Sequence, residues 1–159
     1  MHSVAIVGSR HRGWGKRAVD HTILIDSILQ SRKEYYKDAL NVSSLYCDRC
    51  FGKAVKDYCE EQGIKFFEFV VYFNGPREKH EYTAAYLGRH AALLEVCDEF
   101  HIAVSDTRSS TIEDLVQRVI ASGKSYVLYN DNNEAIEFYD ASAQEKGSYG
   151  QAQAQEETA

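Results

Sequence analysis

The sequence predicts an α/β fold of the doubly wound type, with a mainly parallel five-stranded sheet in the order 3-2-1-4-5 and helices on both faces. Short apolar runs of strand length alternate along the chain with longer segments whose apolar residues recur at helical spacing. Such alternation is typical of a parallel sheet with right-handed crossovers. The length of 159 residues suits one domain.

Each expected strand is a short apolar run that stops at a glycine or at a polar loop, as buried strands do. The five parallel strands are expected at residues 3–7, 41–46, 66–73, 100–104 and 125–129. Between them the apolar spacing changes to that of a helix. Helices are therefore expected over residues 16–32, after Asp48 and ending before Gly63, over residues 81–97, and from about Ile112 to near Gly123.

The carboxyl-terminal part of the chain differs in composition. Residues 135–139 can add a short antiparallel edge strand after a turn over residues 130–133. From about Ala141 the chain consists mostly of Ala, Gln, Glu, Gly and Ser, which offer little to bury. We therefore expect a single domain over residues 1–140 and a disordered tail over residues 141–159.

Composition and charge exclude several classes of function. The net charge of −6 argues against strong nucleic-acid binding. No apolar run approaches the roughly 20 residues of a membrane span, and the N-terminus lacks the apolar core of a signal peptide, so a cytoplasmic protein is expected. Cys47 and Cys50 form a CxxC, but Cys59 and Cys97 stand alone. This spacing predicts reduced thiols and no metal site, and no cofactor is expected.

The loop after the first strand, in the stretch "IVGSRHRGWG" (residues 6–15), concentrates glycine and positive charge. Gly8, Ser9 and Arg10 supply an open backbone, a hydroxyl and a guanidinium between the end of a strand and the start of a helix. Backbone N–H groups also point outward at such a place, which favours a phosphate. A glycine in this position can also serve ordinary turn geometry, so the loop by itself leaves both interpretations open.

Arg89 falls on the apolar stripe of the helix expected over residues 81–97, and a buried guanidinium needs a partner or a ligand. One interpretation is structural: Arg89 reaches the edge of the sheet or pairs with an acid such as Glu113 or Asp114. The other is functional: its head group reaches the crevice at the carboxyl edge of the sheet and binds phosphate in a bidentate manner.

The stretch "SSTIED" (residues 109–114) follows the fourth strand and also has two interpretations. Ser110 and Glu113 have the spacing of a capping box, which alone would explain both residues. Hydroxyls and free N–H groups at a helix N-terminus also bind phosphate, so Ser109, Ser110 and Thr111 are candidate ligand-binding residues. An acid one turn into the helix could polarise a sugar or activate water.

Four segments together resemble the SLOG superfamily of Rossmann-like nucleotide-binding domains, which includes YspA/YpsA-related proteins, DprA and the Lonely Guy phosphoribohydrolases. They are "IVGSR", "YCDRCFGKAVKDYCEEQGI", "LGRHAALLEVCDEFHIAV" and "SSTIEDLVQRVIASGKSYVLY", and they span roughly residues 3–129 in the family's order. After the second strand only Asp48 remains of the family's Gly-Ala-Asp. The resemblance implies that Asp48 belongs to the ligand site.

The resemblance to Lonely Guy enzymes is residue by residue. Arg89-His90 matches the family's Arg-Lys pair, and residues 111–114 match the end of its Pro-Gly-Gly-x-Gly-Thr-x-x-Glu motif, with Asp114 at the acidic position. Thr107 to Ser110 replace the preceding glycines. The resemblance implies catalytic roles for Arg89, Asp114 and Glu113 if the protein hydrolyses the N-glycosidic bond of a nucleoside monophosphate.

Three hypotheses follow from these residues. The first is a domain that binds a nucleotide or a nucleotide-derived phosphorylated ligand between the loops after strands one and four. The second is the N-glycoside hydrolase, for which Asp114 reaches about one methylene less far than the family's Glu. The third is an interaction module that has kept the fold without the ligand. A homodimer stays open.

Overall fold

The protein is described by a computed structural model over residues 2–9, 21–36, 40–46, 49–69, 78–105 and 109–149. Its strands are β1 (His2–Gly8), β2 (Leu40–Tyr46), β3 (Lys65–Glu68), β4 (Glu99–Ala103), β5 (Ser125–Tyr129), β6 (Ala135–Asp140) and β7 (Glu145–Ser148). Its helices are α1 (His21–Tyr35), α2 (Arg49–Gln62), α3 (Lys79–Val96) and α4 (Ser110–Ala121). The α/β class expected from the sequence is confirmed.

The strands form one sheet in the order β3-β2-β1-β4-β5-β6-β7. The first five are parallel and have the predicted order, whereas β6 pairs antiparallel with β5, and β7 pairs antiparallel with β6. The sheet is therefore mixed and seven-stranded, which corrects the five-stranded prediction. The antiparallel edge strand expected at residues 135–139 is present as β6.

The strand β7 also corrects the expectation of disorder from Ala141 onward. Its residues carry almost no apolar side chains, but backbone pairing with β6 does not require any. Gly147 allows the ring of Phe138 to lie directly over the strand, since a Cβ at this position would lie 2.3 Å from the ring. The ring of Tyr149 packs on Phe138 at 5.1 Å between ring centroids. Residues 150–159 of the expected tail lie outside the described residues.

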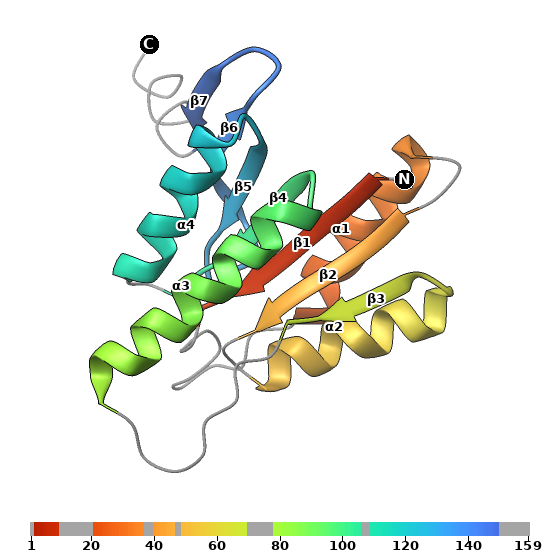
Figure 1. Ribbon diagram of the computed structural model, residues 1–159. Coiled ribbons are helices and arrows are strands. Elements are labelled where there is room, and N and C mark those ends of the chain that lie inside the picture. The colour runs from red at the N-terminus through yellow and green to blue at the C-terminus, as the bar shows by residue number, and fades with distance from the viewer. Residues whose placement is uncertain are drawn as a thin grey trace.

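Two apolar cores lie on opposite faces of the sheet. Helices α1 and α2 cover one face and α3 and α4 cover the other (Figure 1). Alternate residues of the central strands serve the two cores: Val4 and Ile6 of β1 pack under α1 and α2, and Ala5 and Val7 pack under α3 and α4. This double burial explains why β1 reads as an unbroken apolar run.

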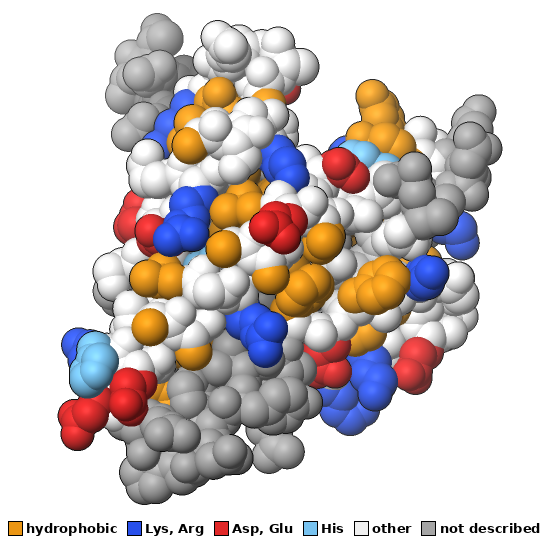
Figure 2. Space-filling view, viewed as in Figure 1, with side chains coloured by type: hydrophobic (Ala, Val, Ile, Leu, Met, Phe, Trp, Pro, Cys, Tyr) orange, Lys and Arg blue, Asp and Glu red, His pale blue; other side chains and the backbone are white. Residues whose placement is uncertain are grey.

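The edge strand β3 is less covered. Helix α3 passes in front of β1 and leaves β3 open on that face (Figure 1). Apolar side chains gather there between α3 and β3 (Figure 2). Phe67 is 43% exposed, and the ammonium group of Lys65 lies over its ring at 5.4 Å from the centroid.

Among the described residues no helix is long and apolar enough to cross a membrane.

Candidate functional site

The strand order reverses between β1 and β4, and this places two loops side by side at the carboxyl edge of the sheet. The backbone N–H of Ser9, directly after β1, donates to the carbonyl of Ala103 at the end of β4 (2.8 Å). The hydroxyl oxygens of Ser9 and Ser105 lie 3.4 Å apart, although the residues are 96 positions apart in the sequence. We call the space beyond these two loops the carboxyl-edge crevice.

Helix α4 begins next to this crevice and brings further hydroxyls. Ser109 has an extended backbone, and its hydroxyl accepts from the N–H of Ile112, so Ser109 is the N-cap. Its hydroxyl oxygen also lies 2.9 Å from that of Thr111. Ser110 is the first helical residue. The predicted capping box of Ser110 and Glu113 is therefore wrong, because the helix starts one residue earlier than the spacing suggested.

Gly8 has a packing role in the described structure. A Cβ at this position would lie 2.6 Å from Cδ1 of Phe51, whose side chain belongs to the core under α1 and α2. The end of β1 can approach α2 so closely only because Gly8 has no side chain. Two other predicted ligand-binding residues, Arg10 and Asp48, lie outside the described residues.

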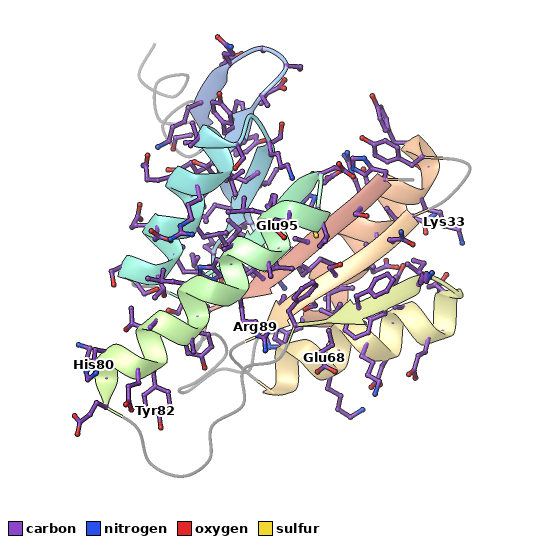
Figure 3. All side chains as sticks on the ribbon, viewed as in Figure 1. Lys33, Glu68, His80, Tyr82, Arg89 and Glu95 are labelled. Carbon is purple, nitrogen blue, oxygen red and sulfur yellow. The ribbon has the colours of Figure 1, made fainter. Side chains whose placement is uncertain are left out.

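Arg89 does not lie on the buried face of α3, and the expectation that it does is wrong. Its side chain is exposed, and it makes no ion pair with the described residues. It projects from α3 toward the ends of β2 and β3 (Figure 3). The inward position belongs to its neighbour His90, which is 2% exposed. The helix is thus rotated by about one residue relative to the predicted stripe, so that His90, Leu93 and Cys97 face the core.

The charges of Asp114 and Arg118 both act on the His90 imidazole. Burial lowers the pKa of His90 to about 4, against the opposing effect of the Asp114 carboxylate, so the imidazole is neutral at pH 7. Its Nδ1 atom is buried and has no hydrogen-bond partner among the described residues. Sequence analysis singled out Arg89 here and missed His90 as the buried group.

Asp114 and Glu113 have different neighbours from those the enzyme hypothesis requires. The carboxylate of Asp114 lies 2.7 Å from Nε of Arg118, one turn further along α4. Glu113 is half-buried, and its backbone N–H donates to the carbonyl of Ser109. Asp114 is therefore engaged with Arg118 on α4, while Arg89 projects from α3 toward the ends of β2 and β3 (Figure 3).

Two of the four cysteines have described side chains, and both are buried and free. Burial raises the pKa of the Cys59 thiol to about 12 and that of Cys97 to about 11. Both are therefore protonated and unreactive at neutral pH. No group of metal-binding side chains occurs within the described ranges.

A polar cluster that the sequence analysis missed lies at the opposite, amino edge of the parallel strands. Glu99 accepts hydrogen bonds from Nε2 of His2 (2.6 Å) and Nε2 of His101 (2.7 Å). Arg32 of α1 lies 3.5 Å from the same carboxylate, and Nδ1 of His101 lies 2.8 Å from the hydroxyl of Tyr129. We call these five residues the amino-edge cluster. One signal was available: Glu99 and His101 alternate within an otherwise apolar strand and so share a face.

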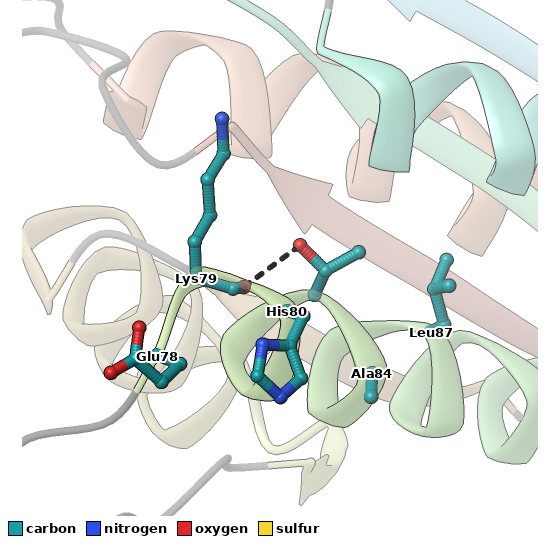
Figure 4. Close-up of a pocket in the computed structure, with 6 residues that line it drawn as sticks. Glu78, Lys79, His80, Ala84 and Leu87 are labelled. Carbon is teal, nitrogen blue, oxygen red and sulfur yellow. Dashed lines mark hydrogen bonds between the residues drawn. The ribbon is translucent and has the colours of Figure 1, made fainter.

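A shallow hollow of about 570 Å³ lies beside the first turns of α3 (Figure 4). Its lining comes from one helix and the residue that precedes it: Glu78, Lys79, His80, Thr83, Ala84 and Leu87. Thr83 donates its hydroxyl hydrogen to the carbonyl of Lys79, a bond within the helix. The hollow gathers no polar groups from different elements, unlike the carboxyl-edge crevice.

Comparisons of the chain with protein-family models, with curated proteins and with solved structures returned no match. The resemblance to the SLOG superfamily therefore stays a prediction from the residues quoted above.

Proposed function

We propose that the protein binds a nucleotide or a nucleotide-derived phosphorylated ligand in the carboxyl-edge crevice. The observation that carries the proposal is the 3.4 Å approach of the Ser9 and Ser105 hydroxyls at the point where the strand order reverses. In doubly wound sheets, ligands bind beyond the carboxyl ends of the strands at this point.

The chemistry of the crevice suits a phosphate. The first turn of α4 carries Ser109, Ser110 and Thr111, and it leaves backbone N–H groups that no helical carbonyl can satisfy. Hydroxyl and N–H donors together with the positive end of the helix dipole favour an anion. Arg10, one residue after Ser9 in the sequence, would add a fixed positive charge from the other loop.

Hydrolysis of an N-glycosidic bond has less support from the geometry. That reaction would require Arg89 and Asp114 to act on one ligand, but Arg89 is exposed on another side of α3, and Asp114 pairs with Arg118. We therefore propose binding and retain hydrolysis only as a sequence-based hypothesis. Release of free base by the wild type, and its loss in Asp114→Asn, would be required to revive it.

Calorimetric titration with AMP, GMP, CMP and UMP, each beside its nucleoside, tests the binding proposal. At least one monophosphate should bind more tightly than its nucleoside, because only the phosphate reaches the hydroxyls and N–H groups of α4. Arg10→Ala should weaken that monophosphate by about 1.5–3 kcal/mol through loss of charge-assisted hydrogen bonds, and it should leave the nucleoside unaffected.

Lys56→Ala is the matched control, since Lys56 is an exposed cation on α2. It removes the same charge from the whole protein without touching the crevice. Equal losses in Arg10→Ala and Lys56→Ala would reduce the effect to net charge and contradict the site. Equal affinities for every monophosphate and its nucleoside would contradict the proposal as a whole.

A further inference from the structure

A groove of about 300 Å³ opens on the sheet face that α1 and α2 cover elsewhere, beside the amino-edge cluster. It exists because β5 continues into the β6–β7 hairpin rather than into a helix, so that no helix follows β5 onto this face. Its lining includes Arg32, Glu99, His101, Ser125, Phe138 and Tyr149, which come from α1, β4, β5, β6 and the residue after β7. We call it the amino-edge groove.

The floor of the groove is rigid and polar. Glu99 and His101 have side chains only 12% and 7% exposed, and the two bond to each other at 2.7 Å. The other ring nitrogen of His101, Nδ1, is hydrogen-bonded to the hydroxyl of Tyr129, and the other carboxylate oxygen of Glu99, Oε1, is hydrogen-bonded to His2. Both ring nitrogens of His101, both carboxylate oxygens of Glu99 and the Tyr129 hydroxyl therefore have hydrogen-bond partners.

The rim of the groove offers hydrogen bonds that the described residues do not use. The guanidinium group of Arg32 has one long contact to Glu99, and its Nε has no acceptor in the described part of the chain. The hydroxyl of Ser125 accepts from the N–H of Ala141, which leaves its own hydrogen to donate. Asp140 keeps acceptor capacity beyond its bonds from Ser142.

The charges in the groove oppose ions of either sign. Glu99 and Asp140 are carboxylates, while Arg32 supplies one positive charge that already faces Glu99. An anion would face both carboxylates. A cation would face Arg32 and would gain only from Asp140, which is exposed to water, because Glu99 is already engaged by Arg32, His2 and His101. An uncharged ligand with both donors and acceptors avoids either repulsion and still bonds to Arg32, Ser125 and Asp140.

One wall is aromatic and held in place. The ring of Phe138 lies over Gly147 and packs against the ring of Tyr149, with 5.1 Å between the centroids and a 50° tilt. Flat π surfaces beside a few fixed polar groups are the usual composition of small-molecule sites. A planar ring gains most from such a wall, because it can stack on it.

We propose that the amino-edge groove binds a small, planar, uncharged heterocycle that carries hydrogen-bond donors and acceptors on its edge, the chemical class of a nucleobase. The juxtaposition that carries the proposal is the unused donors of Arg32 and Ser125 in the same groove as the aromatic rings of Phe138 and Tyr149. This site is separate from the carboxyl-edge crevice, since it lies at the other end of the same parallel strands.

Titration of the full chain with adenine, followed by amide chemical shifts in NMR, tests the proposal. Adenine should shift residues of β5, β6 and β7 saturably. Phe138→Leu should weaken adenine about ten-fold through loss of stacking, whereas Phe67→Leu on β3 should not. Ser125→Ala should weaken it about five-fold, and Ser148→Ala, which removes a β7 hydroxyl that donates to the carbonyl of Ile136, should not.

Three isosteric probes test the charge argument. Benzamide is neutral, benzoate is an anion and benzamidinium is a cation, and all three have a planar ring with a polar edge. Benzamide should bind most tightly of the three. Tighter binding of benzoate or benzamidinium would overturn the proposal.

Ribose 5-phosphate separates this inference from the proposed function. It should not displace adenine from the amino-edge groove, and Ser110→Ala should leave adenine affinity unchanged. Displacement, or shifts confined to residues around Ser9 and Ser109, would assign adenine to the crevice and overturn the proposal. Absence of saturable adenine binding would also overturn it, while the monophosphate titrations would still decide the proposed function.

Discussion

The Nε2 atom of His2 lies 2.6 Å from Oε1 of Glu99 and joins the start of β1 to the start of β4. The two strands are neighbours in the sheet, but the residues are 97 positions apart in the sequence. The contact therefore fastens the two halves of the parallel sheet at the same strand pair whose other ends form the carboxyl-edge crevice. Loss of this contact should lower the free energy of unfolding and should not alter ligand binding in the crevice.

Glu99→Gln should lower the free energy of unfolding by about 1–3 kcal/mol. The Glu99 carboxylate accepts from two imidazole N–H groups, one on each oxygen. In glutamine an NH2 group replaces one of these oxygens, and it cannot accept a hydrogen bond from the imidazole that faces it. Urea unfolding measures the loss, and Glu95→Gln on the exposed face of α3 is the control. A change in Glu99→Gln no larger than in Glu95→Gln would contradict the role of the cluster.

The same residue should make stability depend on acid pH. Burial alone would raise the pKa of Glu99, but hydrogen bonds and charge from His101, His2 and Arg32 outweigh burial and lower it below the ordinary 4.5. A lowered carboxyl pKa stabilises the fold at pH values above 4.5, and this contribution is lost as the pH falls through the folded-state pKa. Below pH 4.5, wild type and Glu99→Gln should therefore converge in stability.

His90 should cause a separate loss of stability as the pH falls from 6.5 to 4. Its folded-state pKa of about 4 lies below its ordinary 6.5, so the unfolded chain binds a proton that the folded chain does not between these two values. The free energy of unfolding should therefore fall as the pH drops from 6.5 to 4, by about 3 kcal/mol in total. His90→Leu should remove this slope in urea unfolding curves measured at each pH.

His80→Leu is the matched control, because His80 is an exposed histidine on the same helix. It should leave the slope between pH 6.5 and 4 unchanged. A slope that persists in His90→Leu would mean that the imidazole is not the group responsible, and that another residue takes up the proton on unfolding.

Two glycines should respond to the same substitution with opposite signs. Gly8→Ala places a Cβ 2.6 Å from the Phe51 ring, and this overpacking should cost about 1–3 kcal/mol. Gly88→Ala lies in mid-helix with nothing within 4 Å of the new Cβ, and the better helix propensity of alanine should add about 1 kcal/mol. Thermal unfolding compares the two variants with the wild type.

The double variant Gly8→Ala with Phe51→Leu checks the cause. Leucine is smaller than phenylalanine and leaves room for the new Cβ. Gly8→Ala should therefore cost less stability when it is added to Phe51→Leu than when it is added to the wild type. Additive losses in the double variant would instead locate the cost in the backbone conformation of Gly8.

The parallel part of the fold could be predicted because its signals are local and strong. The run Val4 to Val7 is apolar on both faces, and Leu115, Val116 and Val119 repeat at helical spacing, so strand and helix were distinguishable. Strand β7 could not be predicted in this way. It is held by backbone pairing and by the fit of Phe138 over Gly147, and neither leaves a periodic apolar pattern.

The candidate site was predictable only where topology determines it. The approach of Ser9 and Ser105 follows from the strand order. Arg89 was misplaced because a helix with few strongly apolar residues defines its buried face poorly, and a rotation of one residue exchanges Arg89 for His90. The amino-edge cluster was missed because its partners come from four elements distant in sequence, and only the Glu99–His101 alternation is local.

The hairpin strand β7 allows a last prediction from truncation. Deletion of residues 145–159 removes β7 and the Tyr149 ring from Phe138, and it exposes the pairing edge of β6. Deletion of residues 150–159 removes a segment of Gly, Gln, Ala, Glu and Thr with little apolar surface to bury. The longer deletion should lower the melting temperature by several degrees, since a loss of about 1 kcal/mol shifts a domain of this size by roughly 2–4 °C. The shorter one should change it by about 1 °C or less. Differential scanning calorimetry distinguishes the two, and equal melting temperatures for both deletions would show that β7 contributes nothing to the stability of the sheet.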